Sequence, residues 1–118
     1  MATAFFFQRI NDHIQYVRKI QKTLNGEGDF QGTDHQNCKL GKWLYGEGRK
    51  EVEALGAAAV TKFEAILDPH QAFHDASARA LAAKAAGNDA TAQMSVTEMD
   101  KLSVLLIREL SALDQMAK

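Results

Sequence analysis

The chain contains one cysteine, Cys38, and four histidines. Cys38 begins the stretch "CKLGKWLY", and His70 and His74 stand four residues apart in "PHQAFH". The other two histidines are His13 and His35. Thiolate sulfur and imidazole nitrogen are ligands that Zn²⁺ takes in tetrahedral sets of four. The residue types therefore predict a zinc site if the fold brings four of them together.

Each of these residues taken alone favours a plainer interpretation. A single histidine on an apolar face is usually a hydrogen-bonded core residue, and a buried free cysteine usually behaves as a small apolar side chain. The pair His70 and His74 is different, because histidines four apart share a helix face and recur as metal ligands. Burying several imidazoles without partners in one small core is costly, and a bound metal removes that cost. The coincidence of these residues favours a metal site.

Two histidines compete for the fourth ligand position. His13 falls within an apolar stripe, where an apolar residue would be expected. His35 lies in "GTDHQN", a polar stretch in which a solvent-facing histidine is the ordinary case. The pattern favours His13, but spacing alone leaves both histidines open.

Long helices must position these residues. Apolar residues recur at alternating spacings of four and three in residues 3–25, which predicts an amphipathic helix. Residues 57–86 and 89–117 predict two further helices, the first rich in alanine and the second with a regular leucine stripe. "LNGEG" and "GND" supply the residues that end a helix or turn the chain.

One proline interrupts the second of these helical segments. At "DPHQ", either a new helix starts with Asp68 as its N-cap, or one long helix is kinked at Pro69. In both cases the two histidines that follow share one helix face.

The segment around the cysteine predicts a short helix, because Leu40 and Trp43 are spaced three apart. We expect Asn37 to cap this helix and Cys38 to lie in its first turn. The positive end of the helix dipole would then lower the pKa of the thiol. Leu40 and Trp43 would anchor the helix to the bundle, and Gly41 would allow close approach.

The composition of the chain limits which kinds of partner and which cellular location we expect. The 118 residues, 46% of them hydrophobic, predict one globular domain over residues 1–118. A formal net charge of -1 gives no electrostatic reason to expect nucleic acid or an anionic membrane as partner. A single cysteine cannot form an internal disulfide, so we expect a cytoplasmic protein. The opening "MATAFFFQRI" lacks the features of a signal peptide, and no apolar run approaches the roughly 20 residues of a membrane span.

These residues resemble the chemoreceptor zinc-binding (CZB) domain family of bacterial chemoreceptors and some diguanylate cyclases, which also occurs as stand-alone proteins. The family signature is a cysteine followed by x-Leu/Phe-Gly-x-Trp, and Cys38, Leu40, Gly41 and Trp43 match it. A histidine in the family's first helix matches His13, and its paired histidines match "PHQAFH". The resemblance covers the chain from about residue 10 to the last helix.

The resemblance implies an all-α fold, an antiparallel four-helix bundle with a short extra helix carrying the cysteine. It also implies a homodimer and a zinc ion whose ligands are His13, Cys38, His70 and His74. Tyr45, Asp12 and Asp75 are candidates to orient the histidines. A closed set of three nitrogens and one sulfur leaves no position for a reacting water, and Gln71 stands where a zinc protease has its glutamate. We therefore expect no enzymatic activity.

By the same resemblance, the function is that of a regulatory or sensory domain in bacterial signalling, of the chemotaxis or cyclic-di-GMP type. It would respond to zinc, or to redox sensing through oxidation of the zinc-bound cysteine, and act on a chemoreceptor or diguanylate cyclase. Two alternatives remain, a structural-zinc interaction module and a zinc store or chaperone. Phe5, Phe6 and Phe7 cannot all face one stripe, so at least one of them is a candidate for a dimer contact or for packing under the chain ends.

Overall fold

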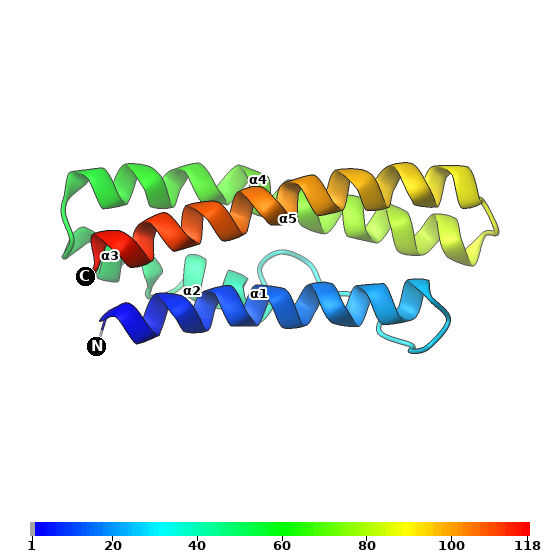
Figure 1. Cartoon of the computed structure of the whole chain (residues 1–118), viewed down its shortest axis with the longest axis horizontal. Helices are drawn as coiled ribbons and strands as arrows, with labels where there is room; N and C mark the ends of the chain where they lie inside the picture. Colours follow the sequence, from blue (N-terminus) through cyan, green and yellow to red (C-terminus); the bar gives the residue numbers. More distant parts are fainter. Residues whose placement is uncertain (1) are drawn as a thin grey trace.

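The computed structural model describes the backbone of residues 2–118 and the side chains from residue 6 onward. Five helices follow one another in this part of the chain, α1 (Ala2–Leu24), α2 (Lys39–Leu44), α3 (Gly48–Glu53), α4 (Ala57–Ala85) and α5 (Asp89–Met116). They form an elongated bundle of 47 × 21 × 20 Å, in which α5 runs opposite to α1 and α4 (Figure 1). The all-α bundle expected from the sequence is confirmed.

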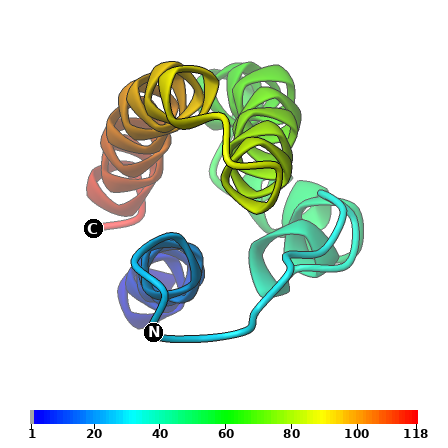
Figure 2. The ribbon, with the colours of Figure 1, turned by 90° about the vertical axis from the view of Figure 1, so that its right-hand side faces the viewer.

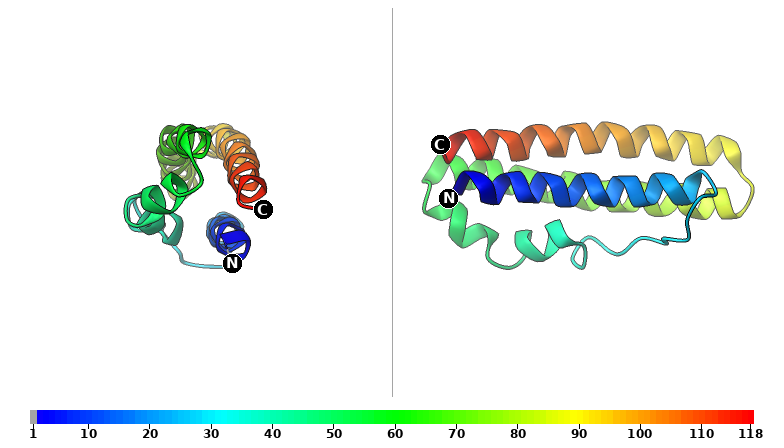
Figure 3. Two further views of the ribbon diagram at one scale, coloured as in Figure 1. Left: turned by 90° about the vertical axis from the view of Figure 1, so that its left-hand side faces the viewer. Right: turned by 60° about the horizontal axis from the view of Figure 1, so that its bottom comes forward.

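The bundle has four corners when it is viewed along its long axis (Figure 2). The helices α1, α4 and α5 occupy three of them, and the short helices α2 and α3 fill the fourth, at the end where α4 begins (Figure 3). Cys38 directly precedes α2, so the short helix expected at the cysteine is present. The fourth corner is thus built from two short helices and the loop that leads into them.

Each long helix buries one stripe of residues. In α4 the buried positions alternate at spacings of four and three, and the stripe includes Ala59, Phe63, Ile66, His70, Phe73, Ser77 and Ala80. This spacing keeps one face of a helix directed at its neighbours, and burying a large apolar side chain contributes roughly 1.5 to 3 kcal/mol. His70 therefore occupies a core position in the middle of α4, with Phe73 packed one turn further along.

The helix ends follow the local signals in the sequence. After α1, Gly26 adopts a φ of 76°, and the N–H of Glu27 bonds the carbonyl of Lys22 at 2.8 Å. Such a left-handed glycine after the last turn is a common way to stop a helix. Pro69 lies inside α4, so the alternative of one long helix is correct and no new helix begins at Asp68.

The phenylalanines near the start of α1 differ in exposure. Phe6 is buried, with its ring edge-to-face against Trp43 at 5.7 Å, whereas Phe7 is 68% exposed. The side chain of Phe5 lies outside the described residues. Within the described residues, no helix combines the length and the apolar character needed to cross a bilayer.

Candidate metal centre

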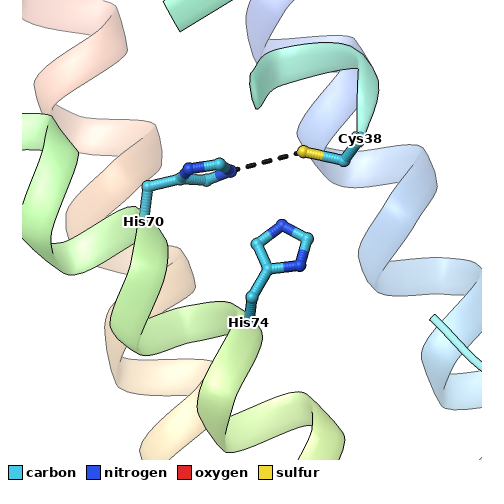
Figure 4. Close-up of side chains that lie close together, drawn as sticks. All are labelled: Cys38, His70 and His74. Atoms are coloured by element: carbon cyan, nitrogen blue, oxygen red, sulfur yellow. Dashed lines mark hydrogen bonds between the residues drawn. The ribbon is translucent and has the colours of Figure 1, made fainter. Parts of the chain in front are cut away.

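Three of the predicted ligands meet in the core between α2 and α4. The potential ligand atoms of Cys38, His70 and His74 all lie within 4.8 Å of one another, and all three residues are buried. The Nε2 atom of His70 is 3.4 Å from the Sγ atom of Cys38. Figure 4 shows one ring nitrogen of His74 directed toward the other two side chains. Residues from the loop before α2 and from α4 are thus brought together.

Cys38 is the N-cap of α2. Its Sγ atom accepts a hydrogen bond from the backbone N–H of Gly41 at 3.1 Å. The expectation that Asn37 caps this helix is therefore wrong by one residue, since the Asn37 side-chain amide donates instead to the carboxylate of Asp34 at 2.8 Å. Because the cap fixes the sulfur, the thiol is held in place before any metal arrives.

Gly41 allows α2 to lie against the preceding loop. A Cβ atom at this position would stand 1.9 Å from the carbonyl oxygen of His35, a distance that no side chain tolerates. The close approach at Gly41 is to this loop, not to another helix of the bundle. Trp43 is buried in an edge-to-face contact with Phe63 at 5.7 Å, and its Nε1–H donates to the carboxylate of Glu51 in α3. These contacts attach α2 to α3 and α4.

Burial sets the protonation of the metal-free site. It raises the pKa of the Cys38 thiol, while the N–H of Gly41 opposes this shift. The lowered pKa expected from a helix dipole is therefore not what this structure supports, because desolvation outweighs the end of a six-residue helix. Burial lowers the pKa of His70 to about 3 and also lowers that of His74. Both imidazoles are neutral at pH 7, and the neutral form is the one that binds metal.

His74 is oriented from outside the cluster. Its Nδ1 atom is 2.9 Å from the carbonyl oxygen of Thr33 and 3.2 Å from the hydroxyl of Tyr16. A hydrogen bond from a ligand histidine to a carbonyl is a common supporting contact in metal sites. Neither residue was predicted from the sequence. Tyr16 could have been suspected only from its position, three residues after His13 on the same helix. Thr33 acts through its backbone, so its residue type does not predict the contact.

The two competing histidines differ in their burial and in their contacts. His13 is buried, its Nε2 atom is 2.9 Å from the Ser103 hydroxyl in α5, and burial lowers its pKa to about 4. His13 does not belong to the group of three ligand candidates. It lies close enough to His74 that a charge on His74 would also lower the pKa of His13. His35 is partly exposed, and its ring stands edge-to-face with that of His70 at a centroid distance of 6.3 Å.

Among the described residues, none of the three residues expected to orient the histidines makes a hydrogen bond to His70 or His74. Tyr45 packs its ring against His35 at 5.6 Å. Asp12 accepts a hydrogen bond from Gln8 at 3.0 Å and pairs with Arg9 at 3.5 Å. Asp75 is exposed on α4.

A groove of about 320 Å³ reaches the cysteine from the surface. It runs between α1 and the segment around Cys38, and Tyr16, Thr33, Lys39 and Lys42 are among the residues that line it. The groove therefore borders Cys38, whose side chain is buried.

The donor set fits zinc. One sulfur and two imidazole nitrogens are typical of tetrahedral zinc sites, whereas Ca²⁺ and Mg²⁺ require oxygen ligands. Residues 13–81, more than half of the chain, match the sequence model of the chemoreceptor zinc-binding domain. No curated protein and no solved structure matched the chain. That family is a family of zinc-binding domains, so zinc is the cofactor. The chain belongs to the chemoreceptor zinc-binding (CZB) domain family.

Proposed function

We propose that the chain is a regulatory zinc domain in which Cys38, His70 and His74 hold the metal and His13 completes the set. The observation that carries this proposal is the buried cluster of one thiol and two neutral imidazoles, with ligand atoms within 4.8 Å. When bound, zinc supplies a rigid tetrahedral link between the segments that carry its ligands. The first test is the zinc content per chain of protein purified without chelator. About one zinc in the wild type and none in Cys38→Ala is expected, and zinc retained by the variant would reject the site.

Several features support His13 as the fourth ligand. It is 3% exposed, its burial keeps it neutral at pH 7, and it lies near enough to His70 that a charge on its ring would lower the pKa of that residue. Binding metal through Nε2 would require the ring of His13 to give up its contact with Ser103. His35 remains the competitor, and single alanine variants of the two histidines decide between them.

A regulatory role follows from the closed ligand set. Three nitrogens and one sulfur fill the four positions of tetrahedral zinc, so no position is left for a reacting water. A hydrolytic zinc enzyme keeps one such position open. The domain is therefore suited to signalling through its conformation rather than to catalysis. Zinc-dependent turnover of model ester or peptide substrates by the wild type would contradict this assignment.

We further propose that oxidation of Cys38 is a signal. A two-electron oxidant such as hypochlorous acid converts the thiolate to a sulfenic acid and is itself reduced to chloride. The oxidised sulfur is a poorer zinc ligand, and it also caps α2, so oxidation would loosen this helix. The groove beside Cys38 supplies access for the oxidant.

Trp43 provides the readout for this proposal, because it is the only tryptophan and lies on α2. A mild dose of hypochlorous acid should release zinc and shift the Trp43 fluorescence of the zinc-loaded protein. Metal-free Cys38→Ser is the control for oxidation elsewhere in the chain, since it leaves the four methionines to react as before. An unchanged spectrum and retained zinc with Cys38 fully oxidised would reject the sensor.

The partners proposed are a second copy of the chain and a signalling protein, a chemoreceptor or a diguanylate cyclase. Phe7 is 68% exposed on α1 and is a candidate for the dimer contact. Sedimentation should show a dimer that Phe7→Ser weakens. A wild-type monomer at tens of micromolar would remove this part of the proposal.

A structural-zinc module without sensing is the second candidate, and the firm attachment of α2 through Trp43 favours it. In that case a chelator would lower the melting temperature, and oxidation of Cys38 would cause no selective change at α2. The oxidant experiment above separates the two functions.

A further inference from the structure

We infer that Tyr16 is a positioning residue of the zinc site: it holds Thr33, whose carbonyl fixes the tautomer of His74, and so ties His74 to the loop that carries Cys38. This inference rests on the proposed function in one respect, that His74 is a zinc ligand. Tyr16 belongs to α1, His74 to α4, and Thr33, which contacts both, to the loop between α1 and α2. The hydroxyl of Tyr16 therefore stands where three parts of the chain meet.

Four short contacts join these three residues. The hydroxyl of Tyr16 accepts a hydrogen bond from the N–H of Thr33 at 3.0 Å. The same hydroxyl lies 3.2 Å from the Thr33 carbonyl oxygen and 3.2 Å from His74 Nδ1. The Nδ1 atom of His74 in turn lies 2.9 Å from the Thr33 carbonyl. Both polar backbone groups of Thr33 are thus satisfied by these two side chains.

The contacts select one tautomer of His74. A carbonyl oxygen can only accept, so a separation of 2.9 Å from Nδ1 places the proton on Nδ1. The Tyr16 hydroxyl then donates to the second lone pair of the Thr33 carbonyl and accepts from the Thr33 N–H. In the opposite tautomer, an unprotonated Nδ1 would face the carbonyl lone pairs. Nε2 is consequently left unprotonated, as a metal ligand must be.

The same arrangement connects His74 to the cysteine. Between Thr33 and Cys38 the chain forms a turn, in which the Asp34 carboxylate accepts the N–H groups of Gln36 and Asn37 at 3.0 Å each. Cys38 follows this turn directly and caps α2. A loop held at Thr33 therefore sets the position of the sulfur as well as the orientation of the imidazole.

The hydroxyl of Tyr16 can be removed without disturbing its ring. The ring is 9% exposed and packs edge-to-face against Phe30 at 5.3 Å and Phe73 at 5.9 Å. A Cβ atom on Gly32 would stand 3.1 Å from the hydroxyl, so the loop closes tightly over it. Tyr16→Phe keeps the ring contacts and deletes only the hydrogen bonds.

The test compares Tyr16→Phe with Tyr45→Phe, the other tyrosine near the site, which is 45% exposed. Tyr16→Phe should still bind one zinc per chain, with a dissociation constant weakened roughly 10-fold in competition with a chelator. The amide hydrogen of Thr33 should exchange faster in this variant, while Tyr45→Phe should match the wild type in both measurements. Wild-type affinity together with wild-type exchange at Thr33 in Tyr16→Phe would overturn the inference.

A second measurement requires no variant and no metal. The ¹⁵N chemical shifts of His74 in the metal-free wild type report which ring nitrogen carries the proton, and Nδ1 is expected. Protonation at Nε2 would overturn the inference even if Tyr16→Phe failed to fold. If the wild-type chain bound no zinc, the proposed function would fail, whereas the tautomer and the Thr33 exchange would still test the role of Tyr16.

Discussion

Cys38 has two separable roles in this structure, and two substitutions distinguish them. Its sulfur accepts the N–H of Gly41 and so caps α2, and it is also the one sulfur ligand of the proposed zinc site. Cys38→Ser keeps a cap acceptor but loses the thiolate, because serine is a favoured N-cap residue and a poor zinc ligand. Cys38→Ala loses both.

The expected changes in the free energy of unfolding differ between metal-free and zinc-loaded protein. In metal-free protein, loss of the cap in Cys38→Ala should lower the free energy of unfolding by about 1 kcal/mol, whereas Cys38→Ser should stay near the wild type. For a chain of this size, 1 kcal/mol corresponds to a shift of about 4 °C in melting temperature. With free zinc at about 100 times its dissociation constant, the wild type should gain about 2.7 kcal/mol, and neither variant should gain.

Urea unfolding of the three proteins, followed by Trp43 fluorescence with zinc or with chelator, measures both differences. A zinc-dependent gain in Cys38→Ser equal to that of the wild type would show that the sulfur is not a ligand. Equal stabilities of the serine and alanine variants without metal would show that the hydrogen bond from Gly41 adds nothing. The two roles can therefore fail independently.

The remaining predictions concern the support of the site and its histidines. Gly41→Ala should lower the free energy of unfolding by roughly 1 to 3 kcal/mol, because its Cβ would overlap the backbone of His35. Gly28→Ala, whose Cβ would have no contact under 3.5 Å, should leave the free energy of unfolding nearly unchanged in the same assay. Burial lowers the pKa of His13 to about 4 and that of His70 to about 3, so below pH 6.5 the unfolded chain takes up protons that the metal-free folded chain does not. Unfolding curves should therefore show stability falling between pH 6.5 and 4, by up to about 1.4 kcal/mol per pH unit for each histidine, and a flat profile would contradict these shifts. His13→Ala should weaken zinc binding by at least roughly 10-fold in a competition titration while His35→Ala leaves it unchanged, and the reverse result would make His35 the fourth ligand.

The sequence predicted the fold well, because helix formation leaves local signals. The three long helices begin and end within about one residue of their expected bounds. Alternating spacings of three and four identified their faces, and residues such as Gly26 and Gly87, both with positive φ, marked their ends. The pairing of His70 with His74 could also be predicted, since spacing on a helix decides it.

The details of the site depended on contacts that spacing does not encode. Asn37 is the better N-cap by residue preference, but Cys38 takes the cap because Asp34 engages the asparagine. The pKa of the thiol rises because the fold buries it, and burial cannot be obtained from the first turn of a helix alone. The contact between His74 and Thr33 uses a backbone carbonyl, to which residue identity gives no clue.

The three clustered residues are held with unequal firmness, and this bears on how a signal would leave the site. Cys38 is fixed by the cap of α2, and His74 is fixed by Thr33. The Nδ1 atom of His70 has no hydrogen-bond partner among the described residues, so within this core Cys38 alone holds its ring by a polar contact. A buried polar group without a partner costs roughly 1 to 3 kcal/mol, so the contact between Nε2 and the sulfur is worth keeping. The orientation of the His70 ring therefore depends on the sulfur. If Cys38 is oxidised as proposed, α2 loses its cap and His70 loses its polar contact in one event, while His74 stays tied to the loop. The change would therefore reach α2 and the middle of α4 together, and through α4 the long hairpin with α5.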